Sequence, residues 1–321
     1  MQNLFLITKP NQLFISLSIL NQIQRTSSDL LIIDNFQSSN HLKSILFKEK
    51  IWNNVYFKKS KIKIIQYFIR GAYSNFYTDS DVGFLNFLIF CMIKILNPKI
   101  KIFVYEEGVG TYSNERLFYD HFKIWVFRQI GIGTNFGNCK FTSGIYLFNV
   151  EKYQNFHPTS TVSLHEIKSD LFSIYTKYND LIDKIYSIKE LHVLIQKHRK
   201  KKCTVILGTY YYSENQYYLT YQSLIKAIND CGVNEEEHLV LIKNHPHKVN
   251  MISIDNMNYA VNVSSSIPAE ILIWILYNYY DVINVIHSGS SVLLYISNYS
   301  FIEYDYDVCF SESLAEKPIG Y

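Results

Sequence analysis

Residues 238 to 247 read His-Leu-Val-Leu-Ile-Lys-Asn-His-Pro-His, an apolar run of strand length that ends in a lysine and two histidines. In open α/β sheets, ligands bind at the carboxyl ends of the strands. Proline restricts the backbone just after His245, which helps to aim its imidazole. The stretch therefore predicts a strand that ends at a binding site formed by Lys243, His245, Pro246 and His247. The alternative is a loop with a solvated lysine and two surface histidines.

The length and composition of the chain predict two ordinary domains. It has 321 residues, of which 48% are hydrophobic, enough to bury two cores. A net charge of +3 is too small to favour nucleic acid as a partner. The five cysteines are scattered without a Cys-x-x-Cys pair, which argues against a disulfide framework and a zinc site. We therefore expect a protein of the reducing cytoplasm.

Strands and helices alternate in the first half of the sequence. Residues 3–8 predict a first strand, and the lack of a basic region before them argues against a signal peptide. The most apolar segment, residues 82–96, predicts a buried helix, because it is shorter than the roughly 20 residues that span a bilayer. The other elements expected here are strands at residues 30–34, 54–57 and 99–105, a helix at 41–49, and a helix or strand at 62–69.

A second alternation occupies the last third of the chain. It predicts strands at residues 203–207, 238–242, 259–263, 281–286 and 301–304, with helices at 217–229, 269–277 and 292–296. Alternation in both halves is typical of parallel sheets with helical crossovers. The fold class that it predicts is α/β, with two Rossmann-like parallel-sheet domains that face a central cleft.

The segment between the two halves has apolar residues at helical spacing and no clear strand. We expect residues 1–160 to form the first domain, 161–202 a helical connector, and 203–321 the second domain. The connector ends in the basic run at residues 197–202, which we interpret as a solvated face. A peripheral contact with the anionic cytoplasmic face of a bacterial membrane is the alternative.

Two adjacent acids end the strand expected at residues 99–105. Glu106 and Glu107 are followed by Gly108 and Gly110. A carboxylate at a strand end can act as a general base, while its neighbour holds a hydrogen-bond network. The glycines allow the backbone to approach a ligand closely. The alternative is a pair of solvated acids at a strand-to-loop junction.

Further candidates for ligand binding lie in the second half. Ser290 and Ser291 stand where a strand meets a helix, and hydroxyls beside the N–H groups of a helix start bind anions. Glu270 lies in the first turn of an expected helix, where an acid can grip the two hydroxyls of a ribose. Gly208 follows a strand in a Gly-Thr turn. The alternatives are ordinary helix capping by the serines and a well-formed helix start at Glu270.

Other short motifs argue against metal and dinucleotide chemistry. Asp79-Ser80-Asp81 and Asp305-Tyr306-Asp307 have the spacing of metal sites for sugar diphosphates, but three-residue patterns arise often by chance, so we interpret both as structural. The sequence has no Gly-x-Gly-x-x-Gly and no Walker-type loop. A dinucleotide-dependent enzyme and an ATPase are therefore not expected.

Three of these motifs together resemble those of bacterial sialyltransferases. Glu106-Glu107-Gly108 resembles their acid-acid-glycine motif, His245-Pro246 their His-Pro motif, and Ser290-Ser291 their Ser-Ser/Thr motif, in the same order along the chain. The opening residues 5–13, the Ser-x-Pro-Ala-Glu at residues 266–270 and the overall length are most similar to glycosyltransferase family 52. That family comprises the lipooligosaccharide and capsule sialyltransferases.

The resemblance implies an inverting GT-B enzyme that moves sialic acid from CMP-sialic acid to a sugar hydroxyl and needs no metal or other cofactor. It implies that Glu106 is the base and that His245 binds or protonates the departing phosphate. Ser290 and Ser291 would bind that phosphate, Glu270 the ribose, and Lys243 would lie near the nucleotide. Because the first motif has two glutamates, Glu107 could act as the base in place of Glu106. His247 is a second imidazole that could bind the phosphate together with His245.

Three other functions remain open from the sequence. They are a polysialyltransferase, a GT-B transferase with another nucleotide sugar such as a UDP sugar, and a non-enzymatic protein of capsule assembly or lectin type. The expected partners are the CMP-sialic acid donor and an oligosaccharide acceptor, with a terminal galactose as a family-based expectation. The helical connector is compatible with an exchanged-domain homodimer of the kind that family 52 implies, or with packing inside a monomer.

Overall fold

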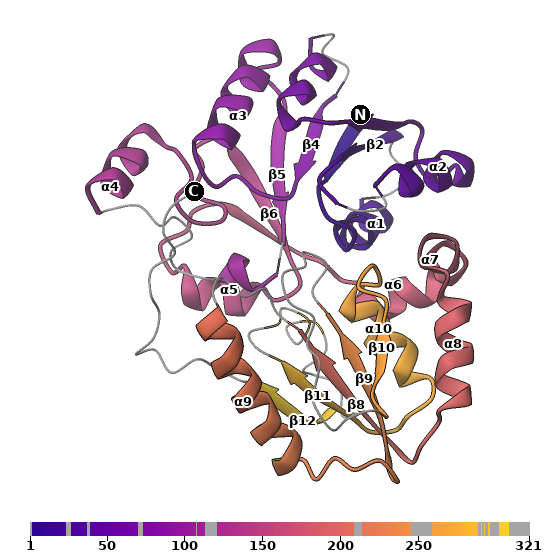
Figure 1. Ribbon diagram of the computed structural model, residues 1–321. Helices are drawn as coiled ribbons and strands as arrows, with labels where there is room; N and C mark the ends of the chain where they lie inside the picture. The colour runs from indigo at the N-terminus through magenta and orange to yellow at the C-terminus, as the bar shows by residue number, and fades with distance from the viewer. Residues whose placement is uncertain are drawn as a thin grey trace. The chain divides into compact units, whose positions relative to one another are not determined.

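The computed structural model of the chain (Figure 1) contains two compact units, residues 1–181 and 182–321, which are described separately below. It describes residues 2–23, 27–36, 39–69, 73–106, 108–112, 121–208, 214–244, 259–287, 290, 292, 295 and 302–307. Several candidate site residues lie outside these ranges. They are Glu107, His245, Pro246, His247 and Ser291.

The first unit is built on a seven-stranded sheet in the order β3-β2-β1-β4-β5-β6-β7, with every neighbouring pair parallel. Its strands are β1 (Gln2–Ile7), β2 (Ser27–Ile33), β3 (Val55–Lys58), β4 (Asn75–Thr78), β5 (Lys101–Tyr105), β6 (Thr142–Leu147) and β7 (Ser163–Glu166). Its central strands are apolar on both faces, as expected of a parallel sheet that is covered on both sides. The sequence predicted β1, β2, β3 and β5, and it missed β4, β6 and β7.

Helices connect these strands. They are α1 (Gln12–Gln22), α2 (Ser39–Glu49), η1 (Lys61–Tyr67), α3 (Phe84–Leu96), η2 (Val109–Tyr112), α4 (His121–Ile130), α5 (Val150–Phe156) and α6 (Leu171–Lys177), where η marks a 3-10 helix. On one face of the sheet, α3 and η1 pack against Leu4, Phe76 and Ile102. The uncertain segment at residues 62–69 is thus mostly the 3-10 helix η1.

A row of aromatic rings crosses the opposite face of the first sheet. Phe5 stacks on Tyr77 at 4.3 Å, Tyr77 stacks on Phe103 at 5.1 Å, and Tyr146 stacks on His165 at 4.8 Å between ring centroids. These five rings come from β1, β4, β5, β6 and β7. Cross-strand aromatic pairs add to the stability of neighbouring strands, so the row ties the sheet together through its centre.

Two expectations for the first unit were wrong. Residues 161–202 do contain a strand, because β7 pairs with β6 at the edge of the first sheet. A short strand with many polar residues gives only a weak hydrophobic pattern in the sequence. Strand β7 has one apolar residue among Ser163, His165 and Glu166, so the pattern did not reveal it. Helix α3 is not fully buried either, since Leu88 is 43% and Ile95 67% exposed.

The second unit contains a five-stranded parallel sheet in the order β10-β9-β8-β11-β12. Its strands are β8 (Lys202–Leu207), β9 (His238–Lys243), β10 (Val261–Val263), β11 (Ile283–His287) and β12 (Ile302–Asp307). The helices are α8 (Ile188–Lys197), α9 (Glu214–Asp230) and α10 (Ala269–Tyr277), and α7 (Asn179–Tyr186) crosses the point where the chain divides. Strand β9, with which the sequence analysis began, is buried at all six residues.

The helical stretch between the two sheets comprises α6, α7 and α8, and the chain divides within α7 at residues 181 and 182.

Four cysteines are described, and all four are free thiols. In the described part of the chain, no helix is both long and apolar enough to cross a membrane.

Candidate functional site

The carboxylate of Glu106 lies at the carboxyl end of β5 and is only 1% exposed. Its Oε2 accepts a hydrogen bond from the Tyr112 hydroxyl at 2.5 Å and another from the Phe148 N–H at 2.8 Å. The Glu106 N–H donates to the Tyr146 carbonyl at 2.9 Å, which extends the pairing of β5 with β6 by one residue. The N–H and the carboxylate of Glu106 are thus both bonded to backbone groups in or just after β6, which holds the carboxylate in place as a preorganised base requires.

Tyr112 donates its hydroxyl hydrogen to the Glu106 carboxylate and is held in place by its surroundings. Burial raises the pKa of Tyr112, and the negative charge of Glu106 raises it further. The ammonium of Lys152 lies 5.3 Å from the centre of the Tyr112 ring, a cation–π contact that helps to orient the phenol. Tyr112 reaches this position because Gly108 turns the chain with a φ of 117°, in the left-handed region that glycine tolerates.

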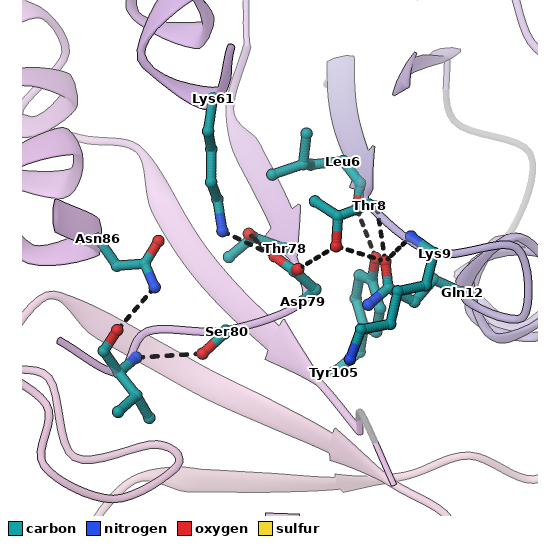
Figure 2. Close-up of polar contacts among 11 residues, drawn as sticks. Leu6, Thr8, Lys9, Gln12, Lys61, Thr78, Asp79, Ser80, Asn86 and Tyr105 are labelled. Atoms are coloured by element: carbon teal, nitrogen blue, oxygen red, sulfur yellow. Dashed lines mark hydrogen bonds and ion pairs between the residues drawn. The ribbon is translucent and has the colours of Figure 1, made fainter. Parts of the chain in front are cut away.

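A second polar network lies where β1 and β4 end (Figure 2). The Thr8 hydroxyl donates to Asp79 Oδ2 at 2.6 Å, and the Lys61 ammonium pairs with Asp79 Oδ1 at 2.8 Å. Because Thr78 is in register with Val104, Asp79 and Glu106 follow neighbouring strands. Burial alone would raise the pKa of Asp79, but the Lys61 charge and the hydrogen bonds hold it below its ordinary value.

Gln12 closes this network from the start of α1. Its side-chain oxygen accepts hydrogen bonds from the N–H groups of Thr8 at 2.7 Å and Lys9 at 3.0 Å (Figure 2). These two N–H groups lie just beyond β1, where the strand ladder no longer supplies them with acceptors. Gln12 therefore fixes the turn that follows β1 and keeps Thr8 in contact with Asp79.

Asp81 belongs to a different network from Asp79. It is fully buried, and it accepts hydrogen bonds from the N–H groups of Gly137 at 2.9 Å and Cys139 at 3.0 Å and from the Thr142 hydroxyl at 2.7 Å. The two acids of the Asp79-Ser80-Asp81 motif thus have separate protein partners, in keeping with a structural interpretation. Within the described ranges, no cluster of three His, Cys, Asp or Glu side chains could hold a metal ion.

His157 is buried, with its Nε2 3.3 Å from the Thr111 carbonyl. Burial lowers its pKa below the ordinary value of 6.5, and the same cause lowers the pKa of His165 and His192. Below about pH 6.5 the unfolded chain therefore binds more protons than the folded one, so protonation favours unfolding.

We expect the free energy of unfolding to fall as the pH falls from 7.5 through the folded-state pKa of His157. In His157→Gln, whose amide can still donate to Thr111, this fall should be smaller, because one of the three imidazoles with a lowered pKa no longer titrates. Urea unfolding at a series of pH values measures the difference. Identical slopes for the two proteins would show that His157 does not resist protonation.

In the second unit, the described candidates lie at the carboxyl edge of the sheet. Lys243 ends β9 and is in register with Leu207 of β8 and Val263 of β10. The Gly208 N–H donates to the Lys243 carbonyl at 2.8 Å, which places the glycine directly beside the lysine. The sheet therefore brings these two residues together although 34 residues separate them, as the position of β9 beside β8 requires.

Lys243 and Glu270 form a buried pair of ionisable groups. They are 6% and 8% exposed. Burial lowers the pKa of Lys243 and raises that of Glu270, while the opposite charge of each acts against both shifts. The charge of Glu270 also raises the pKa of Tyr186 in α7 beyond the effect of burial. The Tyr186 hydroxyl is buried without a hydrogen-bond partner.

Ser290 lies beyond β11, the strand on the other side of β8. Its N–H donates to Nδ1 of the buried His287 at 3.1 Å, and its hydroxyl accepts from the Val292 N–H at 3.3 Å. Since Nδ1 of His287 accepts a hydrogen bond, its proton is carried by Nε2. The bond to Val292 is of the kind that a capping serine makes, and capping is compatible with anion binding.

The structure brings Lys243, Gly208, Glu270 and Ser290 to one edge of the second sheet, and Glu106 to the corresponding edge of the first. The other candidates, Glu107, His245, Pro246, His247 and Ser291, lie outside the described residues. Sequence reasoning missed the groups that hold Glu106 and Glu270. For Glu106 they are Tyr112 and Phe148, and for Glu270 the ammonium of Lys243, whose charge acts on it; no local pattern could reveal them because each acts through the tertiary structure.

No protein-family model matches the sequence, and no curated protein does either. Among solved structures, the chain is similar to an α/β-galactoside α-2,3-sialyltransferase from the luminous marine bacterium Photobacterium phosphoreum. The TM-score is 0.63 at 11% identity, over 94% of this chain and 89% of that one. The GT-B domain of a sialyltransferase from Photobacterium damselae gives a TM-score of 0.52 at 13% identity, over 92% and 88% of the two chains. The chain has the GT-B fold.

The same fold occurs in a second class of proteins that the comparison found. A UDP-GlcNAc 2-epimerase from Methanocaldococcus jannaschii, in complex with UDP-GlcNAc and UDP, gives a TM-score of 0.56 at 10% identity, over 91% of this chain and 80% of that one. At such identities the likeness concerns the fold alone. The predicted α/β class with two parallel Rossmann-like sheets is thus confirmed, and the choice of reaction rests on the site.

Proposed function

We propose that this protein is an inverting, metal-independent sialyltransferase that moves sialic acid from CMP-sialic acid to a hydroxyl of a surface glycan, and that it is related to glycosyltransferase family 52. The observation that carries the proposal is the Glu106 carboxylate, buried at the end of β5 and held through Oε2 by Tyr112 and Phe148. The fold shared with two sialyltransferases supports it.

In the proposed reaction, Glu106 takes the proton of the acceptor hydroxyl as that oxygen bonds to the anomeric carbon of the sialic acid. The bond from this carbon to the CMP phosphate oxygen breaks with inversion, and the electron pair leaves with the phosphate. The anomeric carbon has oxocarbenium character in the transition state, so stabilisation of the leaving group matters more than nucleophilic push. Glu107 is the alternative base.

The second unit would hold the donor. His245 would donate a hydrogen bond or a proton to the departing phosphate, with Ser290, Ser291 and His247 as further donors. Glu270 would bind the ribose, and Lys243, Pro246 and Gly208 would line the nucleoside site. The support for this half of the proposal is the position of Gly208, Lys243, Glu270 and Ser290 at one carboxyl edge, where open α/β sheets bind nucleotides.

The proposed roles explain why Glu270 and Lys243 are buried together. A carboxylate that must accept hydrogen bonds from two ribose hydroxyls needs to be charged when the nucleotide arrives. Burial acts against that charge, and the neighbouring Lys243 ammonium restores it in part. The pair therefore keeps a carboxylate ready in a poorly hydrated position, at the cost of stability that ligand binding would offset.

The test is an assay of CMP release from CMP-sialic acid in the presence of EDTA, with and without lactose as acceptor. We expect release that rises with lactose, and a rise in the melting temperature with CMP that UDP does not match. Activity that EDTA abolishes would contradict the metal-independent mechanism. Stabilisation by UDP and not by CMP, with no CMP release, would contradict the sialyltransferase and favour a UDP-sugar enzyme.

The fold shared with UDP-GlcNAc 2-epimerases makes such an epimerase the second candidate function. The same panel separates the two, because an epimerase would convert UDP-GlcNAc without an acceptor and would not release CMP. A polysialyltransferase would instead use a sialic acid terminus in preference to lactose. A protein that binds neither nucleotide would be the non-enzymatic alternative.

A further inference from the structure

The two helices α3 and α4 carry most of the large apolar side chains that the described structure leaves in water. Nine of the 16 exposed large hydrophobic residues in the described part of the chain lie on these helices. On α3 they are Phe84, Leu85, Leu88, Met92, Ile95 and Leu96, and on α4 they are Phe122, Trp125 and Ile130. Scattered single residues need no explanation, but a concentration of this kind marks an interaction surface.

Helix α3 has no polar face. Its exposed residues Leu88, Met92 and Ile95 lie three or four positions apart and so form one stripe, opposite the buried Phe90 and Ile93. The two polar residues of the helix serve its ends. Asn86 donates to the Val82 carbonyl at 2.8 Å, and Lys94 donates to the Ile100 carbonyl at 2.6 Å.

Helix α4 continues this surface on the same face of the sheet. Its Phe127 packs against the same core cluster as α3, and a bridge between Val82 and Gly133 joins the segments next to the two helices. Phe122 and Trp125 point to water, 74% and 58% exposed, with their rings 6.1 Å apart. We call the exposed residues of α3 and α4 the apolar surface.

The exposed charged residues that the structure describes next to the apolar surface are basic. In the described residues between 79 and 149, the carboxylates Asp79, Asp81 and Glu106 are buried. Of the exposed lysines and arginine there, Lys99, Lys123, Arg128 and Lys140 lie on or next to α3 and α4, whereas Lys101 shares the opposite face of the sheet with Phe103. Glu107, Glu115, Arg116 and Asp120 of this segment lie outside the described residues. The chain as a whole has a net charge of only +3, so this concentration is local.

We propose that α3 and α4 dock this protein on the surface of an anionic lipid bilayer, with the apolar side chains in the interface and the basic residues against the lipid phosphates. Apolar helix faces with flanking lysines bind membranes in this way, through buried apolar area and attraction to anionic lipids. A second copy of the chain is a poorer occupant, because two surfaces of the same charge repel each other.

The tryptophans make the contact measurable. Of the three in the chain, Trp52 and Trp274 are 4% and 7% exposed, so a change in emission on addition of vesicles reports on Trp125. We expect the intact protein to sediment with vesicles of phosphatidylglycerol and phosphatidylethanolamine, with a blue shift in emission. Vesicles of phosphatidylcholine should bind it at least about tenfold more weakly, and added salt should weaken the binding to anionic vesicles.

The decisive variant is Leu88→Glu/Met92→Glu, which puts two carboxylates in the apolar surface. Its matched control is Phe47→Glu/Val193→Glu, at positions on α2 and α8 that are 72% and 63% exposed. We expect the first variant to lose at least about tenfold in vesicle affinity. The control adds the same charge away from the apolar surface, so its affinity should stay close to that of the parent. Both should keep the melting temperature of the parent, because all four side chains are exposed.

Three results would overturn the proposal. One is equal vesicle affinity of the two double variants. Another is sedimentation without a shift in emission, which would place the contact elsewhere. The third is a dimer that Leu88→Glu/Met92→Glu dissociates while no variant binds vesicles, which would identify the partner as a second copy of the chain.

Discussion

Glu106→Gln is expected to reduce sialyl transfer by about 10²–10⁴-fold, the usual contribution of a positioned general base. An amide cannot take the proton of the acceptor hydroxyl at neutral pH. Its oxygen can still accept the hydrogen bonds that Tyr112 and Phe148 donate to Oε2 of the glutamate. The fold should therefore survive, and CMP, which would bind in the second unit, should bind as before.

The measurement is kcat and KM for transfer to lactose, together with the CMP-dependent shift in melting temperature. Glu107→Gln is the paired variant, since it removes the neighbouring acid and leaves Glu106 in place. Full activity in Glu106→Gln with a loss in Glu107→Gln would move the base to Glu107. A loss of CMP binding in Glu106→Gln would instead show that this residue serves the donor.

A positioning role for Tyr112 can be separated from a structural one by the pH profile. Tyr112→Phe removes one of the two described donors to Glu106 Oε2 and so makes the charged carboxylate less stable. The pKa of Glu106 should rise, and the acid limb of the kcat/KM profile should move to higher pH. Because a merely destabilised enzyme would lose activity at every pH alike, an unshifted profile would show that Tyr112 does not tune the base.

Asp81→Ala is expected to cost on the order of 3 kcal/mol of unfolding free energy, because three donors would lose their acceptor inside the protein. Two of them, the N–H groups of Gly137 and Cys139, are backbone groups that cannot turn to another partner. Asp81 lies between β4 and α3, and its bond with the Thr142 hydroxyl connects this segment to the start of β6. Its loss would therefore loosen the connection between β4 and β6.

Urea unfolding measures this loss, with Asp230→Ala as the control. Asp230 ends α9 and is exposed, so its removal should change the stability by less than about 0.5 kcal/mol. The result also bears on the Asp79-Ser80-Asp81 motif. If Asp81→Ala kept full stability while making activity depend differently on added Mg²⁺ or Mn²⁺, the motif would be a metal site and its structural interpretation would be wrong.

Much of the fold was predicted from local patterns. Strand β9 is an uninterrupted apolar run before a polar stretch, and helix α10 was predicted with its observed bounds because Pro268 and Glu270 mark its start. Such signals are strong because burial in a parallel sheet, or the start of a helix, constrains each residue independently of the distant chain. Strand β7 escaped notice because it lies at a sheet edge, where polar residues are tolerated and the pattern is weak.

The candidate site could be predicted only as a set of strand ends. Glu106, Lys243 and Ser290 follow apolar runs, and the rule that parallel sheets bind ligands at their carboxyl ends selected them without knowledge of the strand order. The sequence could not tell that β8 lies between β9 and β11, which brings Gly208 to Lys243. Strand order depends on which crossovers pack, and no short stretch of sequence carries that information.

By itself, the sequence determined the α/β class, the two alternating halves and the residue types that stand at the strand ends. The tertiary structure decided what surrounds those residues. Tyr112 and Phe148 hold Glu106 from 6 and 42 residues away, and the charges of Lys243 and Glu270 act on each other from different elements. It also decided that one side of α3 stays in water. An apolar helix looks the same in sequence whether one or two of its faces are covered, because burial depends on the neighbours that the fold supplies.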